Sequence, residues 1–420
     1  MTPQDLLQHA QQLVKLVLRF EYPADSVVSR YFRENRQLGM RERAALAETV
    51  YVLIRQKPLL QHLAQSGSGP MERRLAVLAW QADARTLLPM LSEQERAWLD
   101  RIHRIDMYAM PEPLRHNLPE WLVEPLKSQL NDEEFWELAE ALDHSAPLDL
   151  RVNTLKIKRE QAQQQLAQSG IQSSLTPYSP WGLRVQGKPA LNKHPLFLDG
   201  SVEVQDEGSQ LLALLVAPKR GDMVVDFCAG AGGKTLALGA AMRNTGRLYA
   251  WDVSAHRLDA LKPRMARSGL SNVHPAAIAH ERDARVKRLY GKVDRVLVDA
   301  PCSGLGTLRR NPDLKWRQTP QSIQELAEKQ QHILASACQL LKHGGSLVYA
   351  TCSLLPAENE VIAQQFEQEH PLFERVSVAQ LLAAQGVADA DQLVQGDYLR
   401  LWTHRHRTDG FFAAVWRRKA

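Results

Sequence analysis

Short apolar runs alternate with helical segments through the second half of the chain, and this alternation is what most limits how the chain can fold. The runs that indicate strands are MVVDF (223–227), RLYAWD (247–252), VDRVLVDA (293–300) and SLVYAT (346–351). The stretches between them are long enough for the crossover helices that parallel strands require. We therefore expect a doubly wound parallel sheet. DYLRLW (397–402) and GFFAAVW (410–416) predict a hairpin on one edge, joined by the polar turn THRHRTD.

Two further regions precede this sheet. From residue 5 to about 140 apolar residues such as Leu6, Ala10, Leu13 and Val17 recur at helical spacing, and no strand is evident. Between about 145 and 215 short alternating runs flank the helical stretch REQAQQQLAQSG, which is typical of a small α+β unit. The predicted domains are an all-α domain at 1–140, an α+β subdomain at 141–216 and an α/β domain at 217–420.

Composition excludes several classes of protein. No apolar run is long enough to span a bilayer, and the N-terminus lacks the order of a secretion signal, so we expect a cytoplasmic protein without a membrane partner. The four cysteines show no CxxC spacing, which argues against a metal site or a disulfide framework. The net charge of +5 is only weak evidence for a polyanionic partner, so evidence for such a partner must come from local clusters of basic residues.

The first strand leads into a glycine-rich loop, DFCAGAGGKT at 226–235. Its small residues would let a ligand approach the backbone, in front of the amide groups of the next helix. A P-loop needs glycine where the chain has Cys228, and the dinucleotide fingerprint needs glycine where it has Thr235. Asp252 ends the second strand, where doubly wound folds place an acid against ribose. S-adenosylmethionine, a ribose-bearing cofactor without phosphate, fits best; the alternative is a tight turn followed by an exposed Asp.

Two cysteines follow neighbouring strands. Asp299 and Cys302 lie in VDAPCSGLG at the end of the strand predicted at 293–300, and Cys352 follows the strand predicted at 346–351 in YATCSLLPAENE. Because the carboxyl ends of parallel strands share one edge of a sheet, both thiols should face one crevice. By contrast, Cys338 lies within a helical run and is expected to be a buried apolar residue, and Cys228 should line the cofactor loop.

A thiol at this place suits one reaction particularly well. Carbon 5 of cytosine is too electron-poor to accept a methyl group directly, but a thiolate that adds to carbon 6 makes carbon 5 nucleophilic. Asp299 could donate a hydrogen bond to ring nitrogen 3 if burial keeps it protonated, and the second thiol is a candidate to assist loss of the proton from carbon 5. The thiolate itself needs a helix N-terminus near Pro356 or a cation such as Lys234.

The motifs DFCAGAGGKT, DAPCSGLGTLRRNPDLKW, YATCSLLPAENE and DGFF resemble, in order and spacing, the Sun (Fmu) family of RNA 5-methylcytosine methyltransferases, over roughly residues 145–417. The resemblance implies a Rossmann-like S-adenosylmethionine-dependent methyltransferase domain. It implies that Cys352 is the nucleophile and that Cys302 assists product release. It places Lys234 near the reacting centre, and it places the cofactor on Cys228, Ala229, Gly230, Ala231, Gly232, Gly233, Lys234, Asp252, Asp283 and Asp299.

The chain departs from the family pattern at two motifs. The family reads Ala-Ala-Pro-Gly-Gly where this chain has residues 229–233 without proline, which puts cofactor affinity in doubt. It reads Gly-Asp-Gly-Arg where this chain has RDAR, which puts the contact of Asp283 with adenine in doubt. The helical region, notably RERAALAETVYVLIRQ, is similar to the NusB-like RNA-binding domain of bacterial members of the family.

Local charge gives separate support for RNA as the partner. LRRNPDLKWR at 308–317 would place basic side chains beyond the strand that carries Asp299, where a nucleic-acid backbone would pass: Arg309, Arg310, Lys315 and Arg317. RLWTHRHR at 400–407 either contacts RNA or caps a hairpin. We expect a monomeric enzyme that methylates carbon 5 of a cytidine in 16S ribosomal RNA. The alternatives are the same reaction on transfer RNA, a non-catalytic ribosome-assembly factor and a thiol redox protein.

Overall fold

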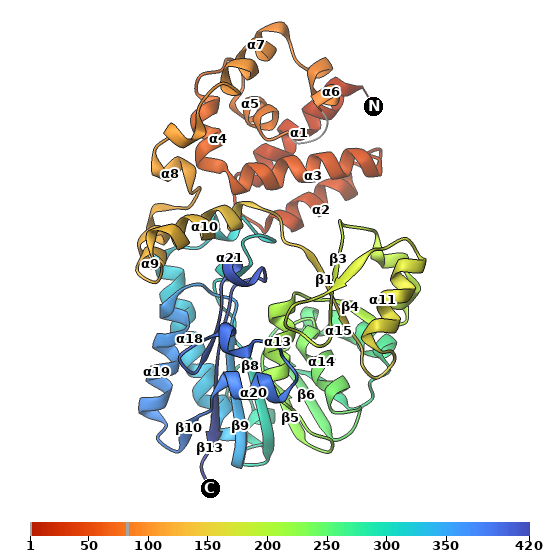
Figure 1. The fold of residues 1–420 in the computed structure, drawn as a ribbon, viewed down its shortest axis with the longest axis vertical. Coiled ribbons are helices and arrows are strands. Elements are labelled where there is room, and N and C mark those ends of the chain that lie inside the picture. The colour runs from red at the N-terminus through yellow and green to blue at the C-terminus, as the bar shows by residue number, and fades with distance from the viewer. Residues whose placement is uncertain (1, 81–83) are drawn as a thin grey trace. The chain divides into compact units, whose positions relative to one another are not determined.

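The computed structural model describes residues 2–80 and 84–420 (Figure 1). The chain divides into two compact units: Met1–Ser145 together with Thr307–Pro320, and Ala146–Gly306 together with Gln321–Ala420. We call Thr307–Pro320 the docked segment. The sequence predicts that these residues belong to the α/β domain, whereas the structure joins them to the helical unit. The small α+β subdomain and the α/β domain form one unit, which we call the catalytic unit.

The helical unit is built from amphipathic helices, and its described residues contain no strand. A capping box at Thr2 begins the first helix and another at Ser92 begins the seventh, so each start is fixed by local hydrogen bonds. Leu7, Leu13 and Val14 of the first helix are fully buried, as the helical spacing predicts. The helices are α1 (Pro3–Val17), α2 (Ala24–Glu34), α3 (Met40–Arg55), α4 (Lys57–Ala64), α5 (Met71–Leu78), α6 (Ala84–Leu87), α7 (Glu93–Ile102), α8 (Glu112–Arg115), α9 (Glu120–Lys127), α10 (Asp132–Asp143) and, from the docked segment, α17 (Leu314–Arg317).

The small subdomain has an antiparallel sheet in the order β2-β3-β1-β4. Its elements are β1 (Leu148–Val152), α11 (Arg159–Gln168), β2 (Ser173–Leu175), β3 (Gly182–Val185), α12 (Pro195–Leu198) and β4 (Val202–Val204). Leu150, Leu166 and Leu183 fill its core. The predicted α+β unit is therefore present, with α11 at the helical run that the sequence indicates.

The large sheet has the order β11-β12-β13-β9-β8-β5-β6-β7. Strands β7, β6, β5, β8 and β9 are parallel, and β13 joins β9 in antiparallel register. The chain runs outward from β5 through β6 to β7 and then returns to place β8 on the other side of β5, so the carboxyl ends of β5 and β8 form a topological switch point. Its strands are β5 (Met223–Asp226), β6 (Arg247–Asp252), β7 (Val273–Ala277), β8 (Val293–Asp299), β9 (Leu341–Thr351), β10 (Phe373–Arg375), β11 (Val394–Gln395), β12 (Tyr398–Leu401) and β13 (Phe411–Arg418).

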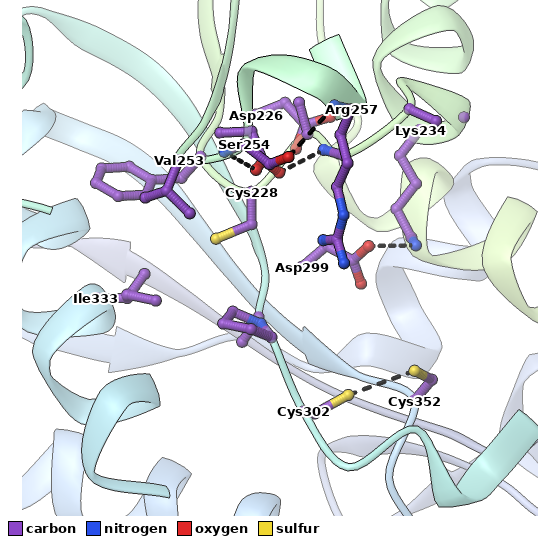
Figure 2. A pocket seen from close by; sticks show the side chains of 18 of the residues that line it. Asp226, Cys228, Lys234, Val253, Ser254, Arg257, Asp299, Cys302, Ile333 and Cys352 are labelled. Atoms are coloured by element: carbon purple, nitrogen blue, oxygen red, sulfur yellow. Dashed lines mark hydrogen bonds and ion pairs between the residues drawn. The ribbon is translucent and has the colours of Figure 1, made fainter. Parts of the chain in front are cut away.

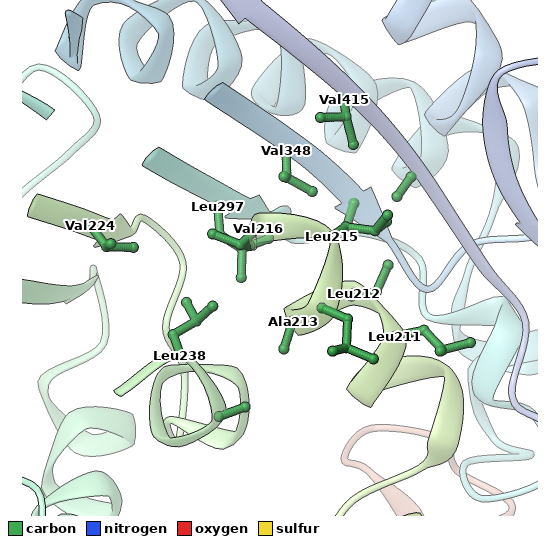
Figure 3. Close-up of a cluster of buried hydrophobic side chains, with 14 of the residues drawn as sticks. Leu211, Leu212, Ala213, Leu215, Val216, Val224, Leu238, Leu297, Val348 and Val415 are labelled. Carbon is green, nitrogen blue, oxygen red and sulfur yellow. The ribbon is translucent and has the colours of Figure 1, made fainter. Parts of the chain in front are cut away.

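Both faces of this sheet are covered, because successive strand residues point to opposite sides. Val224 and Val348 pack with helices on one face, and that cluster is drawn in Figure 3. Val225 and Tyr349 pack on the other face. The helices of the first face are α13 (Glu207–Val216), α14 (Gly233–Ala241), α15 (Ala255–Ser268) and α20 (Val378–Ala384); those of the second are α18 (Pro320–Ala337) and α19 (Glu360–Glu369).

The predicted edge hairpin is present, since β12 pairs antiparallel with β13. The connection between them is a helical turn, α21 (Thr403–His406), rather than the polar turn that its composition indicates. Across the described chain, no helix has the length and apolar character needed to cross a membrane.

Candidate functional site

The loop after β5 is held by backbone geometry and by hydrogen bonds. Gly230 N donates to Asp252 Oδ2 at 2.8 Å, which ties the loop to the end of β6. Gly232 adopts a left-handed conformation with φ of 82°, and an added Cβ would lie 2.1 Å from Leu261 Cδ1. Glycine is therefore required at 232 for conformation and packing. Arg264 Nη1 donates to Ala231 O at 2.6 Å and fixes the position where the related family has proline.

A cavity of about 670 Å³ lies at the switch point and brings most of the predicted site residues together (Figure 2). Asp252 and Asp299 line it from the ends of β6 and β8, and Cys302 and Cys352 line it beyond β8 and β9. The loop contributes Cys228, Ala229, Gly230, Ala231, Gly233 and Lys234, with Gly232 outside the lining. Such a cavity at the carboxyl ends of parallel strands is where doubly wound folds bind ligands.

The two thiols are adjacent. Cys302 Sγ and Cys352 Sγ are 3.3 Å apart, although 50 residues separate them in the chain. The pKa of Cys302 is raised well above that of a free thiol by its hydrogen bond with Cys352, by burial and by the nearby charges of Cys352 and Glu358. Cys302 is thus a thiol at neutral pH, and its proton can be donated toward Cys352 Sγ.

Lys234 and Asp299 form an ion pair within the cavity, with Nζ and Oδ2 2.6 Å apart. Burial alone would lower the pKa of Lys234, but Asp299 and Cys352 outweigh it and raise that pKa. The role suggested for Asp299 as a hydrogen-bond donor depended on burial, whereas its side chain is 29% exposed and its Oδ2 is paired with Lys234 Nζ. The cavity presents a paired cation and anion beside the thiols.

Asp226 is a cavity residue that sequence reasoning missed. It ends β5, is 1% exposed and accepts a 2.7 Å hydrogen bond from Thr235 Oγ1. Its Oδ1 is buried without a hydrogen-bond partner among the described residues. Burial raises its pKa to about 7. The sequence signal that could have identified Asp226 is an acid at the end of the first strand, in VVDF. Its unsatisfied oxygen marks a place where a polar group of a ligand could bind.

Asp283 does not reach this cavity. It caps the short helix α16 (Ala284–Lys287), where its Oδ1 accepts from Arg285 N and its Oδ2 from Ala279 N. Ile278 and Glu281, which precede it in the chain, line the cavity instead. Asp283 is thus outside the cavity lining, and its contact with the cofactor stays a prediction.

The remaining cysteines lie as the sequence predicts. Cys228 lines the cavity, and burial raises the pKa of its thiol well above the usual range. Cys338 is 2% exposed within the core, where burial raises its pKa to about 11. Neither thiol contacts the pair. No group of residues suited to hold a metal ion occurs in the described parts of the chain.

The basic docked segment lies differently from the expectation. Lys315 is 2% exposed, and its Nζ donates to Arg55 O at 2.8 Å. Arg309 is 7% exposed, and its carbonyl accepts from Arg55 Nη2. These two side chains are thus part of the interior of the helical unit, which corrects their assignment to an RNA backbone. Arg310 and Arg317 are partly exposed and remain predicted contacts.

Some residues of the second basic and aromatic cluster, at 400–407, are also buried in the interior. Arg400 is 3% exposed, and its Nη2 donates to Leu354 O at 2.8 Å, within the loop after Cys352. Trp402 is likewise buried. Arg405 and Arg407 are exposed. This cluster therefore supports the cysteine loop and the hairpin through its buried members.

Known proteins match both the sequence and the fold. A family model described as 16S rRNA methyltransferase RsmB/F matches residues 213–417, and one for the ferredoxin-like domain of RsmF/B-like methyltransferases matches 118–192. A Synechocystis protein named probable ribosomal RNA small subunit methyltransferase B is 36% identical to this chain, and the match covers 77% of this chain and 72% of that protein. A Bacillus subtilis protein of the same name is 35% identical, and the match covers 72% of this chain and 66% of that protein.

Solved structures agree. The crystal structure of PH0851 superposes with a TM-score of 0.80 at 25% identity and covers 99% of both chains. A methyltransferase homologue from Pyrococcus horikoshii superposes with a TM-score of 0.62 at 29% identity, over 75% of this chain and 100% of that one. The chain therefore belongs to the RsmB/F family of RNA methyltransferases and is an RNA methyltransferase with a Rossmann-like catalytic domain.

Proposed function

We propose that this protein methylates carbon 5 of a cytidine in 16S ribosomal RNA with S-adenosylmethionine, through a covalent bond between Cys352 Sγ and carbon 6 of the base. The observation that carries the proposal is the pair of thiols 3.3 Å apart beside the ion pair of Lys234 and Asp299. A thiolate, a cation and a hydrogen-bond acceptor are the groups that activation of a cytosine ring requires. The names of the relatives supply ribosomal RNA as the substrate class.

The cavity fits the cofactor on several counts. Asp252 would face the ribose, and residues 228–231 would lie against the rest of the molecule. The unsatisfied Oδ1 of Asp226 suits the amino group of a methionine moiety, since a buried acceptor without a partner is costly. When bound, S-adenosylmethionine supplies the methyl group.

Each group of the chain then has a defined task. Lys234 stabilises the thiolate of Cys352 by its charge, and Cys302 donates its thiol proton toward the same sulfur. The thiolate forms a bond with carbon 6, and Lys234 stabilises the negative charge that the ring develops. Asp299 accepts a hydrogen bond from the exocyclic amine, a group that cytosine has and uracil lacks.

Cys302 has its second task after the methyl group is in place. A water molecule takes the proton from carbon 5, the electron pair of that bond restores the double bond between carbons 5 and 6, and the bond from carbon 6 to Cys352 Sγ breaks to leave the thiolate. Cys302 assists this release from its place beside Cys352. Without it the covalent intermediate should persist.

The test compares wild type, Cys352→Ala and Cys302→Ala with tritiated S-adenosylmethionine and small-subunit RNA. Methyl incorporation and protein-linked RNA on denaturing gels are both measured. We expect Cys352→Ala to lose at least about 1,000-fold in methyl transfer and to form no adduct, because it lacks the nucleophile. Cys302→Ala should accumulate the adduct and turn over slowly.

Other outcomes would contradict the proposal in distinct ways. Methylation of transfer RNA but not of ribosomal RNA would keep the chemistry and change the substrate. RNA binding by wild type without methyl transfer to any RNA would favour an assembly factor. An adduct that persists in Cys352→Ala would assign the nucleophile elsewhere.

A further inference from the structure

Glu358 is a fully buried acid between the two loops that carry the thiols. It ends the 3₁₀ turn Pro356–Glu358, and its side chain is 0% exposed. Burying a carboxyl group costs free energy unless hydrogen bonds replace those it made to water. A buried acid is therefore expected to have a role that its hydrogen bonds provide. Its contacts show what it holds.

The carboxylate bonds to the residue that follows each cysteine. Ser303, next to Cys302, donates its backbone N to Glu358 Oε1 at 2.8 Å and its hydroxyl to Oε2 at 2.5 Å. Ser353, next to Cys352, donates its hydroxyl to the same Oε2. Gln330 Nε2 donates to Oε1 at 3.0 Å. One side chain therefore joins both cysteine loops through hydrogen bonds to Ser303 and Ser353.

Further bonds make this connection stiff. Tyr349 OH donates to Glu358 O at 2.6 Å, which fixes the backbone of Glu358 against the middle of β9. Gly306 N donates to Cys352 O at 2.8 Å and links the two loops a second time. Asn359 Nδ2 donates to Ser353 O at 3.0 Å. The separation of the two sulfurs is thus set by bonds one residue away from each of them.

We propose that Glu358 is a positioning residue that holds the loops of Cys302 and Cys352 in register, so that both thiols reach the same target base. This inference rests on the proposed function for its catalytic consequence, but the geometry that it claims can be measured without RNA. Reacting groups must be held within about 0.5 Å of their productive places, which bonded supporting residues provide.

The experiment uses Glu358→Ala, with Glu358→Gln as the conservative variant, in the full chain. Dibromobimane, which becomes fluorescent when it alkylates two neighbouring thiols, reports whether Cys302 and Cys352 remain adjacent, and peptide mapping separates this bridge from Cys228 and Cys338. Single-turnover reactions with small-subunit RNA measure adduct formation and adduct resolution separately. The matched control is Glu207→Ala, since Glu207 is also 0% exposed but accepts from the backbone of Tyr178 and Ser179 instead.

We expect Glu358→Ala to lose the bimane bridge and to slow adduct formation about 100-fold, the effect of a displacement of about 1 Å. Glu358→Gln keeps the shape and one acceptor oxygen, which can serve Ser303 N and Gln330 Nε2, while its amide nitrogen can donate to the serine hydroxyls, so it should restore the bridge and most of the rate. Glu207→Ala should lower thermal stability without changing the bridge. If Glu358→Ala behaves like Glu207→Ala, Glu358 merely stabilises the fold and the inference fails.

Two serine variants decide the matter even if Glu358→Ala does not fold. Ser353→Ala removes the hydroxyl bond that ties Glu358 to the nucleophile loop and should slow adduct formation. Ser303→Ala removes the hydroxyl bond to the other loop, leaves the backbone bond of Ser303 in place, and should slow resolution, so that adduct accumulates. Equal effects of both on both steps would overturn the inference. A wild type that methylates no RNA would instead overturn the proposed function, and the bimane bridge would still decide the role of Glu358.

Discussion

Asp226 shows at the scale of one residue how a binding cavity can reduce the stability of the fold. Its Oδ1 is buried without a partner among the described residues, and its pKa is raised to about 7 by burial, with Asp299 nearby. The folded chain therefore holds a proton at Asp226 that the unfolded chain releases above its ordinary pKa of 3.8. Between about pH 4 and pH 7 the contribution of Asp226 to the free energy of unfolding therefore falls as the pH rises.

Asp226→Asn should remove this dependence. The neutral amide can still accept from Thr235, so we expect the variant to melt at a higher temperature than wild type at pH 8 and at a similar temperature near pH 4. A shift of about three pKa units sets an upper limit of about 4 kcal/mol on the gain. The variant should also bind S-adenosylmethionine about tenfold more weakly if Oδ1 accepts from its amino group.

Thermal melts from pH 4 to pH 8, with calorimetric titration of the cofactor, check this prediction. Asp259→Asn is the control, because that carboxylate is exposed and pairs with Lys262 on α15. Parallel pH curves for Asp226→Asn and wild type would show that Asp226 does not titrate in this range.

At the scale of elements, the glycine-rich loop shows how local sequence and tertiary contact share one task. The family pattern stiffens this loop with proline, and the present chain has Ala231 there. Arg264 of α15 holds Ala231 O and is itself held by Glu203 of β4 at 2.9 Å. A hydrogen bond from a neighbouring helix thus restrains the loop at the position where this chain lacks the proline ring of the family pattern.

Arg264→Ala should loosen this loop. We expect cofactor affinity to fall about tenfold, as loss of one hydrogen bond from a charged donor implies, while the rate at saturating cofactor changes little. Arg267→Ala is a matched control, because Arg267 pairs with the same Glu203 at 2.6 Å and makes no hydrogen bond to the loop in the structure. Equal losses in the two variants would assign the effect to Glu203 and not to the loop.

The sequence allowed the elements to be predicted wherever their cause is local. Strand β6 has the bounds that its apolar run indicates, and Cys302 and Cys352 meet because parallel strands end at one edge. Features that depend on contacts between distant parts of the chain could not be predicted from the sequence. Strand β9 begins at Leu341, through a Lys-His-Gly-Gly stretch that reads as a turn, because pairing with β8 extends it. Lys315 reads as an exposed base, and only the fold reveals the helices that bury it.

At the scale of the whole molecule, the docked segment makes the helical unit depend on residues from the distant half of the chain. Asp313 Oδ2 accepts from Ala24 N at the start of α2, whose N-cap Pro23 has no side-chain acceptor. Lys315 Nζ and Trp316 Nε1 donate to Arg55 O and Ile54 O at the end of α3. An acid thus caps a helix N-terminus and a base caps a C-terminus, as the helix dipole favours.

Trp316→Ala should therefore destabilise the helical unit selectively. The side chain packs against the core of that unit, its indole donates to Ile54 O at 2.8 Å, and Lys57 Nζ lies 4.3 Å from its ring centroid. Loss of a partly buried tryptophan costs about 3 kcal/mol. Because two units need not unfold together, hydrogen exchange is the appropriate measurement: amides of α3 and α4 should exchange faster while those of β5 and β8 stay protected.

Trp181→Ala, in the catalytic unit, is the reciprocal control and should leave α3 and α4 protected. A fragment of residues 1–145 gives the stronger test, since it lacks all the caps that the docked segment provides. We expect its α2 and α3 to exchange faster than in the full chain, and a peptide of residues 305–320 to restore part of that protection. Equal protection in fragment and full chain would mean that the helical unit is stable on its own. Faster exchange in the fragment would mean instead that the helical unit needs the docked segment, which begins five residues after Cys302, for its stability.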